Sequence, residues 1–259
     1  MPAAVLAGVA AWAAVRTCHA PSGVPDDAAW QRAATEVRSH FQAGDLIVFA
    51  PAWIDPVGRQ HLGDLIPVDA AGRLDAARFP TIWHVAVRNA TNPDVAGATA
   101  RESQDFDGVT VTRFEQPKIT VTADAAALLP TAKAAGAIAR GPSLELAEVG
   151  FAPHRCVQVV PQPNKSVRIT YPGMALGTTL VAGVGLADIF TRRDVRAPGK
   201  LEIEIGGTIV ATAQFGVDDG WVKLQAATQP GAADVTFIAT AVGANARDRL
   251  ICFAAEARQ

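Results

Sequence analysis

Residues 179–215 read TLVAGVGLADIFTRRDVRAPGKLEIEIGGTIVATAQF, and they contain two predicted strands together with the turns that fix them. From residue 201 to residue 205, leucine and isoleucine alternate with glutamate, which places apolar side chains on one face of a strand and charge on the other. Gly206 and Gly207 can adopt the positive φ angles of a tight hairpin, and the alternation resumes from Ile209 to Phe215. This stretch predicts a β-hairpin inside an antiparallel sandwich.

The hairpin is one of a series of short apolar stretches at regular spacing. Turn formers such as Pro172-Gly173 and Asp218-Asp219-Gly220 separate the stretches, and no helical pattern interrupts the series. The other predicted strands cover residues 143–149, 156–160, 167–171, 179–186, 221–226, 235–241 and 250–255. We therefore expect a jelly-roll β-sandwich over residues 142–259, with Gly141-Pro142 as the joint to the preceding module.

A small α/β domain with parallel strands is expected over residues 26–141, so that the whole chain is an α+β protein of two modules. A helix is predicted over residues 27–41, because apolar side chains recur there at helical spacing after a capping aspartate. Residues 46–50, LIVFA, are typical of a strand covered on both faces. A helix over about residues 68–77 and a strand over residues 82–87 follow, and a right-handed crossover would make the two strands parallel.

The remaining part of this domain has weaker signals. Residues 51–67 and 89–107 are predicted to be connecting loops. Short strands are expected after Gly108 and after Pro117. Residues 124–139 are rich in alanine but interrupted by Pro130, which favours a short helix or an exposed connector.

Length and charge restrict the function. With 259 residues, 49% of them hydrophobic, the chain can form one or two domains with a buried core. Its 23 Lys and Arg residues against 25 Asp and Glu residues give a net charge of −2. This charge supplies no sustained positive field for a phosphate backbone, so we expect no nucleic-acid partner.

The N-terminal residues 1–25 form an apolar segment and a linker. The uncharged run from Pro2 to Val15 is shorter than the roughly 20 residues of a membrane span. It suits the apolar part of a signal peptide, the remaining end of a membrane helix, or a helix packed on the domain. The sequence leaves these three alternatives open, and membrane association through residues 2–15 is one expectation.

Two of the three cysteines fall in strands that can be neighbours. Cys156 lies at the beginning of the predicted sandwich and Cys252 in its last strand, and in many jelly rolls the first and last strands pair. A disulfide between them would fit an oxidising compartment. Two buried free thiols are an equally good interpretation.

No catalytic motif stands out in the sequence. The five histidines are scattered without metal-ligand spacing, and the nucleophile, phosphate-binding, dinucleotide and zinc motifs are absent. We expect no cofactor and no metal, apart from a structural Ca²⁺ that Asp218 and Asp219 could hold.

One loop in the first module gathers residues that could bind a ligand. An exposed tryptophan can stack on a sugar ring while neighbouring polar groups bond to its hydroxyls, although a helix cap with a salt bridge would explain the same residues. The candidates in this loop are Trp53, Asp55, Arg59, His61 and Asp64. A second candidate group, Asp188, Arg192 and Arg193, lies at the end of an apolar strand of the sandwich, where a charged rim is the simpler interpretation.

The first module carries a resemblance over about sixty residues. The run DDAAWQRAATEVRSHFQAGDLIVFAP from Asp26 to Pro51, followed by the strand containing IWHV, resembles the soluble region of bacterial mannosyl- and aminoarabinosyl-transferase-like membrane glycosyltransferases. The resemblance implies a periplasmic region and a membrane glycosyltransferase as partner. That family's catalytic acidic residues belong to membrane loops absent from this chain, so no transferase activity is carried over.

The second module is similar to jelly-roll modules attached to glycan-active enzymes. The residues that carry this likeness are Val184 to Asp188, VGLAD, and Leu201 to Gly207. The chain departs from the pattern in having one tyrosine and only Trp221 in this module. The resemblance implies carbohydrate binding by the jelly roll.

Taken together, the sequence predicts a non-catalytic protein of the bacterial periplasm or cell envelope, linked to surface glycan assembly and able to bind carbohydrate. Two alternatives stay open. One is a glycosyltransferase-related or hydrolytic enzyme that uses the loop from Trp53 to Asp64. The other is a purely structural interaction module.

Overall fold

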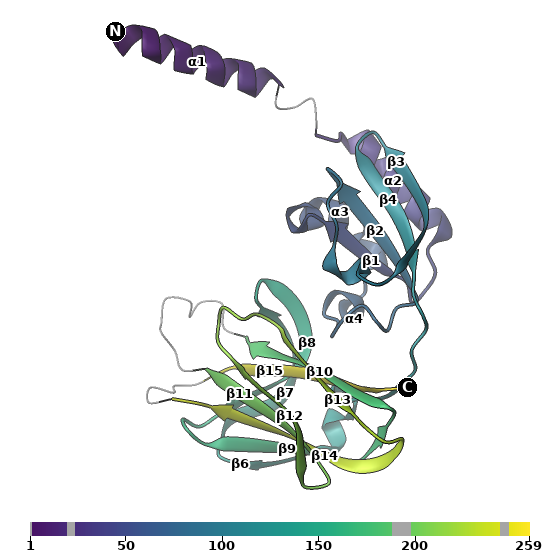
Figure 1. Ribbon diagram of the computed structural model, residues 1–259, viewed down its shortest axis with the longest axis vertical. Coiled ribbons are helices and arrows are strands. Elements are labelled where there is room, and N and C mark those ends of the chain that lie inside the picture. Colours follow the sequence, from purple (N-terminus) through teal and green to yellow (C-terminus); the bar gives the residue numbers. More distant parts are fainter. Residues whose placement is uncertain (1, 20–23, 188–197, 244–248) are drawn as a thin grey trace. The chain divides into compact units, whose positions relative to one another are not determined.

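The computed structural model describes residues 2–19, 24–187, 198–243 and 249–259 (Figure 1). The chain forms two compact units, the first comprising Met1–Ile66 and Phe79–Pro117, and the second Pro67–Arg78 and Lys118–Gln259. The predicted boundary between residues 141 and 142 is therefore wrong. Residues 121–136 hydrogen-bond to strands of the sandwich, which the Ala-rich composition of this stretch did not indicate.

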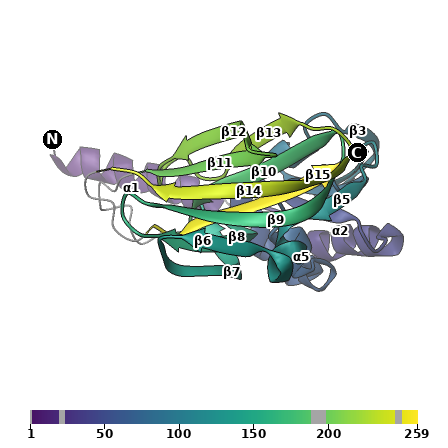
Figure 2. The same ribbon diagram turned by 90° about the horizontal axis from the view of Figure 1, so that it is seen from below.

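The second unit is a sandwich of two antiparallel sheets. Its helices and strands are β5 (Val121–Asp124), α5 (Ala125–Leu128), β6 (Lys133–Gly136), β7 (Ile138–Val149), β8 (Ala152–Pro161), β9 (Ser166–Leu176), β10 (Thr179–Leu186), β11 (Gly199–Ile205), β12 (Thr208–Phe215), β13 (Val222–Ala227), β14 (Gly231–Ala241) and β15 (Ile251–Arg258). One sheet has the order β13-β10-β15-β8-β7, with β5 also paired to β15, and the other has the order β12-β11-β14-β9-β6. Figure 2 shows β11, β14 and β9 side by side in the second sheet.

The strands from β8 to β15 follow jelly-roll connectivity. Consecutive strands alternate between the two sheets in the first half, so that β8-β15-β10-β13 in one sheet faces β9-β14-β11-β12 in the other. The first and last strands of this series, β8 and β15, are neighbours. The predicted jelly-roll sandwich is thus observed, with β6 and β7 added at sheet edges and β5 paired to the end of β15.

The predicted hairpin at residues 201–215 is observed, but Ile209, which the alternation placed inward, is 44% exposed because the pairing register shifts between Ile203 and Glu204. Leu201 and Ile203 are fully buried on the inner face, while the glutamates between them point outward. Gly206 and Gly207 have φ angles of 57° and 84°, and such left-handed conformations are the ones that a two-residue hairpin turn demands. The return strand buries Phe215 in the same core.

The sandwich core lies between the inner faces of the two sheets. Tyr171 and Phe237 meet edge to face with ring centres 5.6 Å apart, and Phe237 stacks on Phe253 at 4.7 Å. All three rings are almost completely buried. Since truncation of one such ring costs about 3–5 kcal/mol, this aromatic row is a major source of stability for the second unit.

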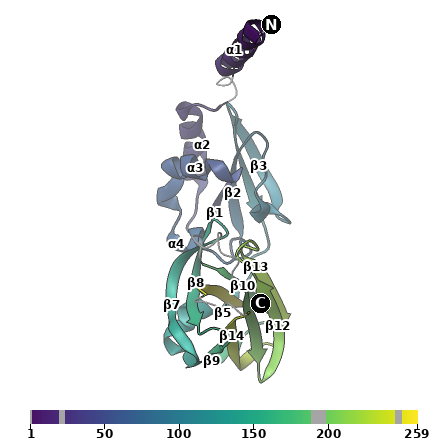
Figure 3. The same cartoon turned by 90° about the vertical axis from the view of Figure 1, so that its left-hand side faces the viewer.

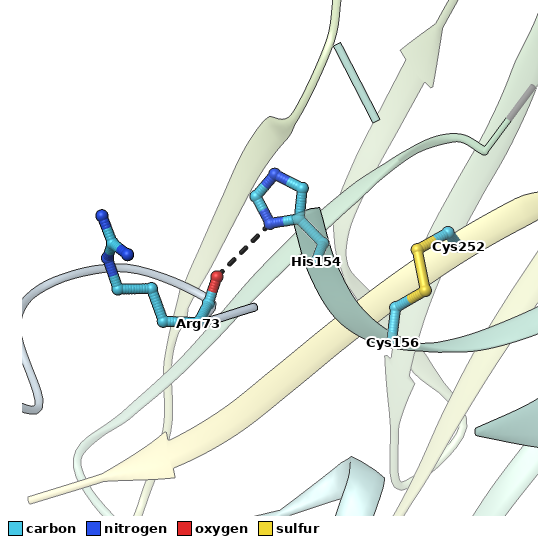
Figure 4. Close-up of a disulfide and its surroundings, with 4 residues drawn as sticks. All are labelled: Arg73, His154, Cys156 and Cys252. Atoms are coloured by element: carbon cyan, nitrogen blue, oxygen red, sulfur yellow. Dashed lines mark hydrogen bonds between the residues drawn. A yellow bond between two sulfur atoms is a disulfide. The ribbon is translucent and has the colours of Figure 1, made fainter. Parts of the chain in front are cut away.

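A disulfide joins Cys156 of β8 to Cys252 of β15, with their Cα atoms 5.5 Å apart (Figure 4). Of the two alternatives that the sequence left open, the bridge is the one observed. Both cysteines are fully buried and pack with Val149 on the outer side of the sheet. The bridge is possible because the jelly roll makes its first and last strands adjacent.

The first unit contains a four-stranded sheet with the order β1-β2-β4-β3 (Figure 3). Its helices and strands are α2 (Asp27–His40), β1 (Leu46–Ala50), the 3-10 helix η2 (Ala52–Ile54), α3 (Asp55–Leu62), η3 (Gly63–Leu65), β2 (Thr81–Val87), η4 (Pro93–Val95), β3 (Thr99–Phe106) and β4 (Val109–Glu115). The predicted parallel pairing of β1 with β2 is confirmed. The pairs β2-β4 and β4-β3 are antiparallel, so the sheet is mixed and not wholly parallel as predicted.

One face of this sheet is covered by α2 and α3, which Figure 3 shows on the same side. The apolar side of α2 buries Trp30 and Val37 against Phe49 of β1 and Val85 of β2. Asp26 begins the helix by accepting a hydrogen bond from the Ala29 amide at 2.8 Å. The helical spacing and the cap predicted from the sequence are both confirmed.

Three segments differ from their prediction. The stretch 89–107 contains strand β3, whose side chains are almost all exposed and therefore lack the alternation of a half-buried strand. The stretch 51–67 is mostly helical, with α3 at its centre. The helix predicted over residues 68–77 is a single turn, α4 (Val68–Ala71), and it belongs to the second unit.

The segment 67–78, here named the strap, leaves the first unit and packs on the sandwich sheet. The Arg155 amide of β8 donates a hydrogen bond to the Gly72 carbonyl at 2.7 Å, and the Arg155 side chain pairs with Asp69. On one side, β15 pairs with β8 at residues 251–253 and with β5 at residues 256–258. The strap lies near residues 254–256, between these two pairings. The strap therefore completes a sheet to which it does not belong in sequence.

The N-terminal segment forms α1 (Pro2–His19), and its apolar side chains between residues 5 and 15 are exposed. Among the helices of the described ranges, none combines the length and the hydropathy that crossing a bilayer requires.

Candidate functional site

A hollow of about 240 Å³ in the first unit lies where the parallel strands β1 and β2 end. We name it the Trp53 hollow. Its apolar lining is supplied by Val24, Pro25, Trp30, Trp53, Ile54 and Val57, together with Val87 at the end of β2. Four polar side chains, Asp27, Gln60, His61 and Arg88, complete it. The carboxyl ends of parallel strands are where open α/β sheets place ligands, because loops diverge there.

Two tryptophans give the hollow a rigid aromatic wall. Trp53 lies in η2, directly after β1, and 62% of its surface is exposed. Trp30 of α2 lines the hollow from the inside and packs in the core of the first unit. The His61 ring of α3 lies parallel to the Trp30 indole, with ring centres 6.0 Å apart and 9° between the planes.

Arg88 reaches the hollow from the turn that follows β2. Arg88 and Asn89 have φ angles of 57° and 55°, in the left-handed region that side chains other than glycine seldom adopt. The Arg88 guanidinium carbon lies over the Trp53 ring at 5.6 Å from its centre. This contact between a cation and an aromatic face keeps the guanidinium beside the exposed indole.

The acidic group of the hollow already has partners. The Asp27 carboxylate lies 3.4 Å from Nε2 of His61 and accepts a hydrogen bond from Gln31 at 2.5 Å. The hollow thus offers an exposed ring, a paired carboxylate and imidazole, an amide at Gln60 and a guanidinium. These groups can stack on a ligand ring and hydrogen-bond to it.

Of the five loop residues proposed from the sequence, the structure brings Trp53 and His61 together and turns the other three away from the hollow. Asp55 and Arg59 pair along α3 at 2.5 Å, one helical turn apart. Asp64 accepts two hydrogen bonds from Arg38 at 2.6 and 2.7 Å, and these bonds hold the pKa of its carboxyl below the usual value. These carboxylates act as local structural partners in this unit.

The charged group proposed on the sandwich, Asp188, Arg192 and Arg193, lies outside the described residues. At the proposed Ca²⁺ turn, Asp219 accepts a hydrogen bond from the Gly216 amide at 2.6 Å. In the part of the chain that the structure describes, no group of three histidine, cysteine or acidic side chains could hold a metal ion.

A second and wider hollow, of about 650 Å³, lies on the outer face of the sandwich around β10 and β13. Its polar side chains come from Asp75, Thr178, Thr179, Lys223, Gln225, Arg258 and Gln259. None of the described residues that line it has an aromatic side chain. A sugar ring would therefore find hydrogen-bonding groups here but no surface on which to stack.

Trp221, the only tryptophan of the sandwich, is packed between other groups. Its indole lies 4.0 Å from the His154 ring with 7° between the planes. On its other side, a side chain at Gly183 would meet the indole at 2.2 Å, so that only glycine permits this approach. His154 in turn contacts the Arg73 carbonyl of the strap at 3.3 Å through Nδ1 (Figure 4). Trp221 therefore serves packing.

The sequence did not reveal Trp30, Asp27, Gln60 and Arg88 as residues of the hollow. A signal for Arg88 existed, because a polar residue directly after a buried strand lies at the edge where parallel strands end. Trp30 and Asp27 looked like ordinary positions of a helix, and only the packing of α2 beside α3 brings them to the hollow.

No family model matches the sequence, and no curated protein matches it. Among solved structures, a CBM51 module of a Clostridium perfringens GH95 protein, in complex with methyl-galactose, is 12% identical, covers 54% of this chain and 99% of its own, and has a TM-score of 0.37. Tandem CBM51 modules of a Streptococcus pneumoniae family 98 glycoside hydrolase are 11% identical, cover 60% of this chain and 56% of their own, with a TM-score of 0.35.

A β-1,3-glucan binding CBM6 from Bacillus halodurans is 13% identical, covers 48% of this chain and 95% of its own, and has a TM-score of 0.29. This chain spans little more than half of the tandem CBM51 structure. The ligand of the present chain has to be argued from its own residues, because likeness at these identities concerns the fold alone.

Proposed function

We propose that this chain is a non-catalytic carbohydrate-binding protein whose principal ligand site is the Trp53 hollow. The observation that carries the proposal is an exposed indole that stands in a concave hollow with hydrogen-bonding groups around it. Sugars combine an apolar ring face with a rim of hydroxyl groups, and this combination matches one aromatic surface flanked by polar side chains. The wider hollow of the sandwich is a second contact surface at most, because its lining lacks a ring.

The acidic groups around the hollow favour binding over hydrolysis. Glycoside hydrolysis uses two carboxyl groups on either side of the scissile bond. The two candidate carboxylates of the loop from Trp53 to Asp64 have other partners, since Asp55 pairs with Arg59 and Asp64 with Arg38, and neither lines the hollow. Asp27 is then the one carboxylate among the described lining residues, so the enzyme alternative has no acid and base pair at this place.

The cell envelope is the location that we propose for this protein. The disulfide between Cys156 and Cys252 supports an oxidising compartment, since cytosolic thiols are kept reduced. An envelope protein that binds glycans could work beside a membrane glycosyltransferase, the partner that the resemblance of the first module implies. The exposed apolar side chains of α1 support a role of this helix in attachment.

Binding to an array of bacterial and plant glycans tests this function, with Trp53→Ala as the decisive variant. The loss of the stacking surface should weaken binding by about tenfold. Trp12→Ala is the matched control, because Trp12 is 64% exposed and does not line the hollow. If no glycan binds the wild type, the proposal fails in favour of a structural interaction module. If Trp53→Ala binds glycans as tightly as the wild type, the binding site is not the Trp53 hollow and lies elsewhere on the protein.

A further inference from the structure

The Arg88 guanidinium carries a positive charge without an acidic partner. Arg88 is exposed, and among the described residues no carboxylate lies within salt-bridge distance of it. The guanidinium lies over the Trp53 ring, and within the described part of the chain its N–H donors make no hydrogen bond, so they are available to a ligand. By contrast, the Asp27 carboxylate of the hollow lies beside the His61 imidazole, 3.4 Å from its Nε2.

We propose that the Trp53 hollow selects glycans that carry a carboxylate, as uronic acids do, and that Arg88 determines this specificity. The inference rests on the function proposed above and narrows its ligand class. A sugar carboxylate can accept two parallel, charge-assisted hydrogen bonds from a guanidinium. A neutral sugar has no carboxylate and cannot form this strong pair. The hydroxyl groups of a neutral sugar would gain little from the charge.

The backbone fixes the Arg88 side chain where such a ligand needs it. Pairing of β2 with β4 continues to Val87 opposite Val109, and the Ala90 amide then closes a turn on the Val87 carbonyl at 3.1 Å. Arg88 and Asn89 adopt left-handed angles inside this turn. Residues held in such costly conformations gather at ligand sites, because the surrounding structure has to maintain them against strain.

The distance between the two recognition groups suits one sugar unit. The guanidinium carbon lies 5.6 Å from the centre of the Trp53 ring, longer than the roughly 3.5–4.0 Å of stacking contact. The guanidinium is therefore not in close stacking contact with the indole, and a sugar ring that packs on the exposed part of the indole would bring its exocyclic carboxylate near the guanidinium. One monosaccharide can then contact both groups at once.

The test is calorimetric binding of trigalacturonic acid and of the matched neutral galactotriose to the full chain. We expect the wild type to bind the acidic sugar about tenfold more tightly, as one charge-assisted contact provides. Arg88→Gln should bring this ratio close to one, and Arg88→Lys should restore part of it. Arg140→Gln is the matched control, because this substitution removes the same charge from an exposed arginine of the other unit.

The outcomes separate this inference from the function on which it rests. Equal affinity of the wild type for both sugars overturns the inference and leaves carbohydrate binding intact. A ratio unchanged in Arg88→Gln, or lost equally in Arg140→Gln, also overturns it, because the preference would then come from another group or from net charge. If neither sugar nor any glycan of the array binds, the proposed function and the inference both fail.

Discussion

At the scale of single residues, His84 is a buried base in the middle of β2. Only 6% of its surface is exposed, and its Nε2 accepts a hydrogen bond from the Asn92 amide at 3.2 Å. Burial lowers the pKa of His84 below its ordinary value of 6.5. The neutral ring is therefore the form that the folded first unit requires.

This pKa predicts that the first unit loses stability in mildly acidic solution. Below pH 6.5 the unfolded chain takes up a proton at His84 before the folded chain does, so the free energy of unfolding falls until the pH reaches the lowered pKa. Above pH 6.5 this residue contributes no pH dependence. Urea unfolding followed by tryptophan fluorescence between pH 5 and 8 measures the effect. The His84→Gln variant should lack this component, and an equal slope in the variant would refute the assignment.

The residues of the site could be predicted only where local sequence decided them. Trp53 and His61 belong to the polar and aromatic stretch that follows a buried strand, which made them candidates. Asp55 and Arg59 looked equally suitable because Pro56 and Gly58 make the segment read as a loop. Once it is helical, their spacing of one turn pairs them with each other.

At the scale of elements, the strap is held on the sandwich by buried ion pairs. Arg258 of β15 donates hydrogen bonds at 2.9 Å to both carboxylate oxygens of Asp75, and it also contacts Glu256. Arg78 of the strap pairs with the other oxygen of Glu256 at 3.2 Å. Burial alone would lower the pKa of Arg258, but the hydrogen bonds of Asp75 and the charge of Glu256 raise it.

Loss of one member of this network should destabilise the second unit. Asp75→Asn leaves the nearly buried guanidinium of Arg258 with less compensating charge, and breaking a buried pair in this way costs about 3–5 kcal/mol. The matched control is Glu204→Gln in the more exposed pair with Arg168, for which about 1 kcal/mol or less is expected. Urea unfolding of both variants gives the comparison. If both variants lose a similar free energy of unfolding, the buried pair of Asp75 with Arg258 stabilises the second unit no more than a surface pair does.

Elements with a buried face were the predictable ones, because one buried face gives an alternating pattern and two buried faces give a continuous apolar run. β11 alternates and was found, and so was β1, whose five residues are all buried. β3 has polar side chains on both faces because it is the exposed edge of its sheet. The strap, in turn, is ordered by charges of β8 and β15 that lie far along the chain, which no local pattern can reveal.

At the scale of the whole molecule, the disulfide closes a large part of the second unit. Cys156 and Cys252 are 96 residues apart in sequence, and their bridge connects the first and last strands of the jelly roll. A crosslink over a loop of this length restricts the unfolded chain strongly. The bridge therefore acts on the sandwich and not on the first unit.

Reduction of the bridge should lower the free energy of unfolding of the sandwich by about 2–5 kcal/mol. Hydrogen exchange with and without reductant provides the measurement, because peptides from β8 and β15 should lose protection. Peptides from β1 and β2 serve as the reference within the same molecule. The Cys156→Ser/Cys252→Ser variant should reproduce the effect and should not respond to reductant. Unchanged exchange in β8 and β15 would contradict the expected role.

The strap also has a consequence for how the two units can be inherited. The chain passes between the units at residues 66–67, 78–79 and 117–118, so each unit is interrupted by the other in the gene. A gene fusion at any single one of these points would transfer an incomplete unit, because the strap would be separated from the rest of the second unit or would stay inserted in the first. Each unit can therefore be transferred whole only together with the other.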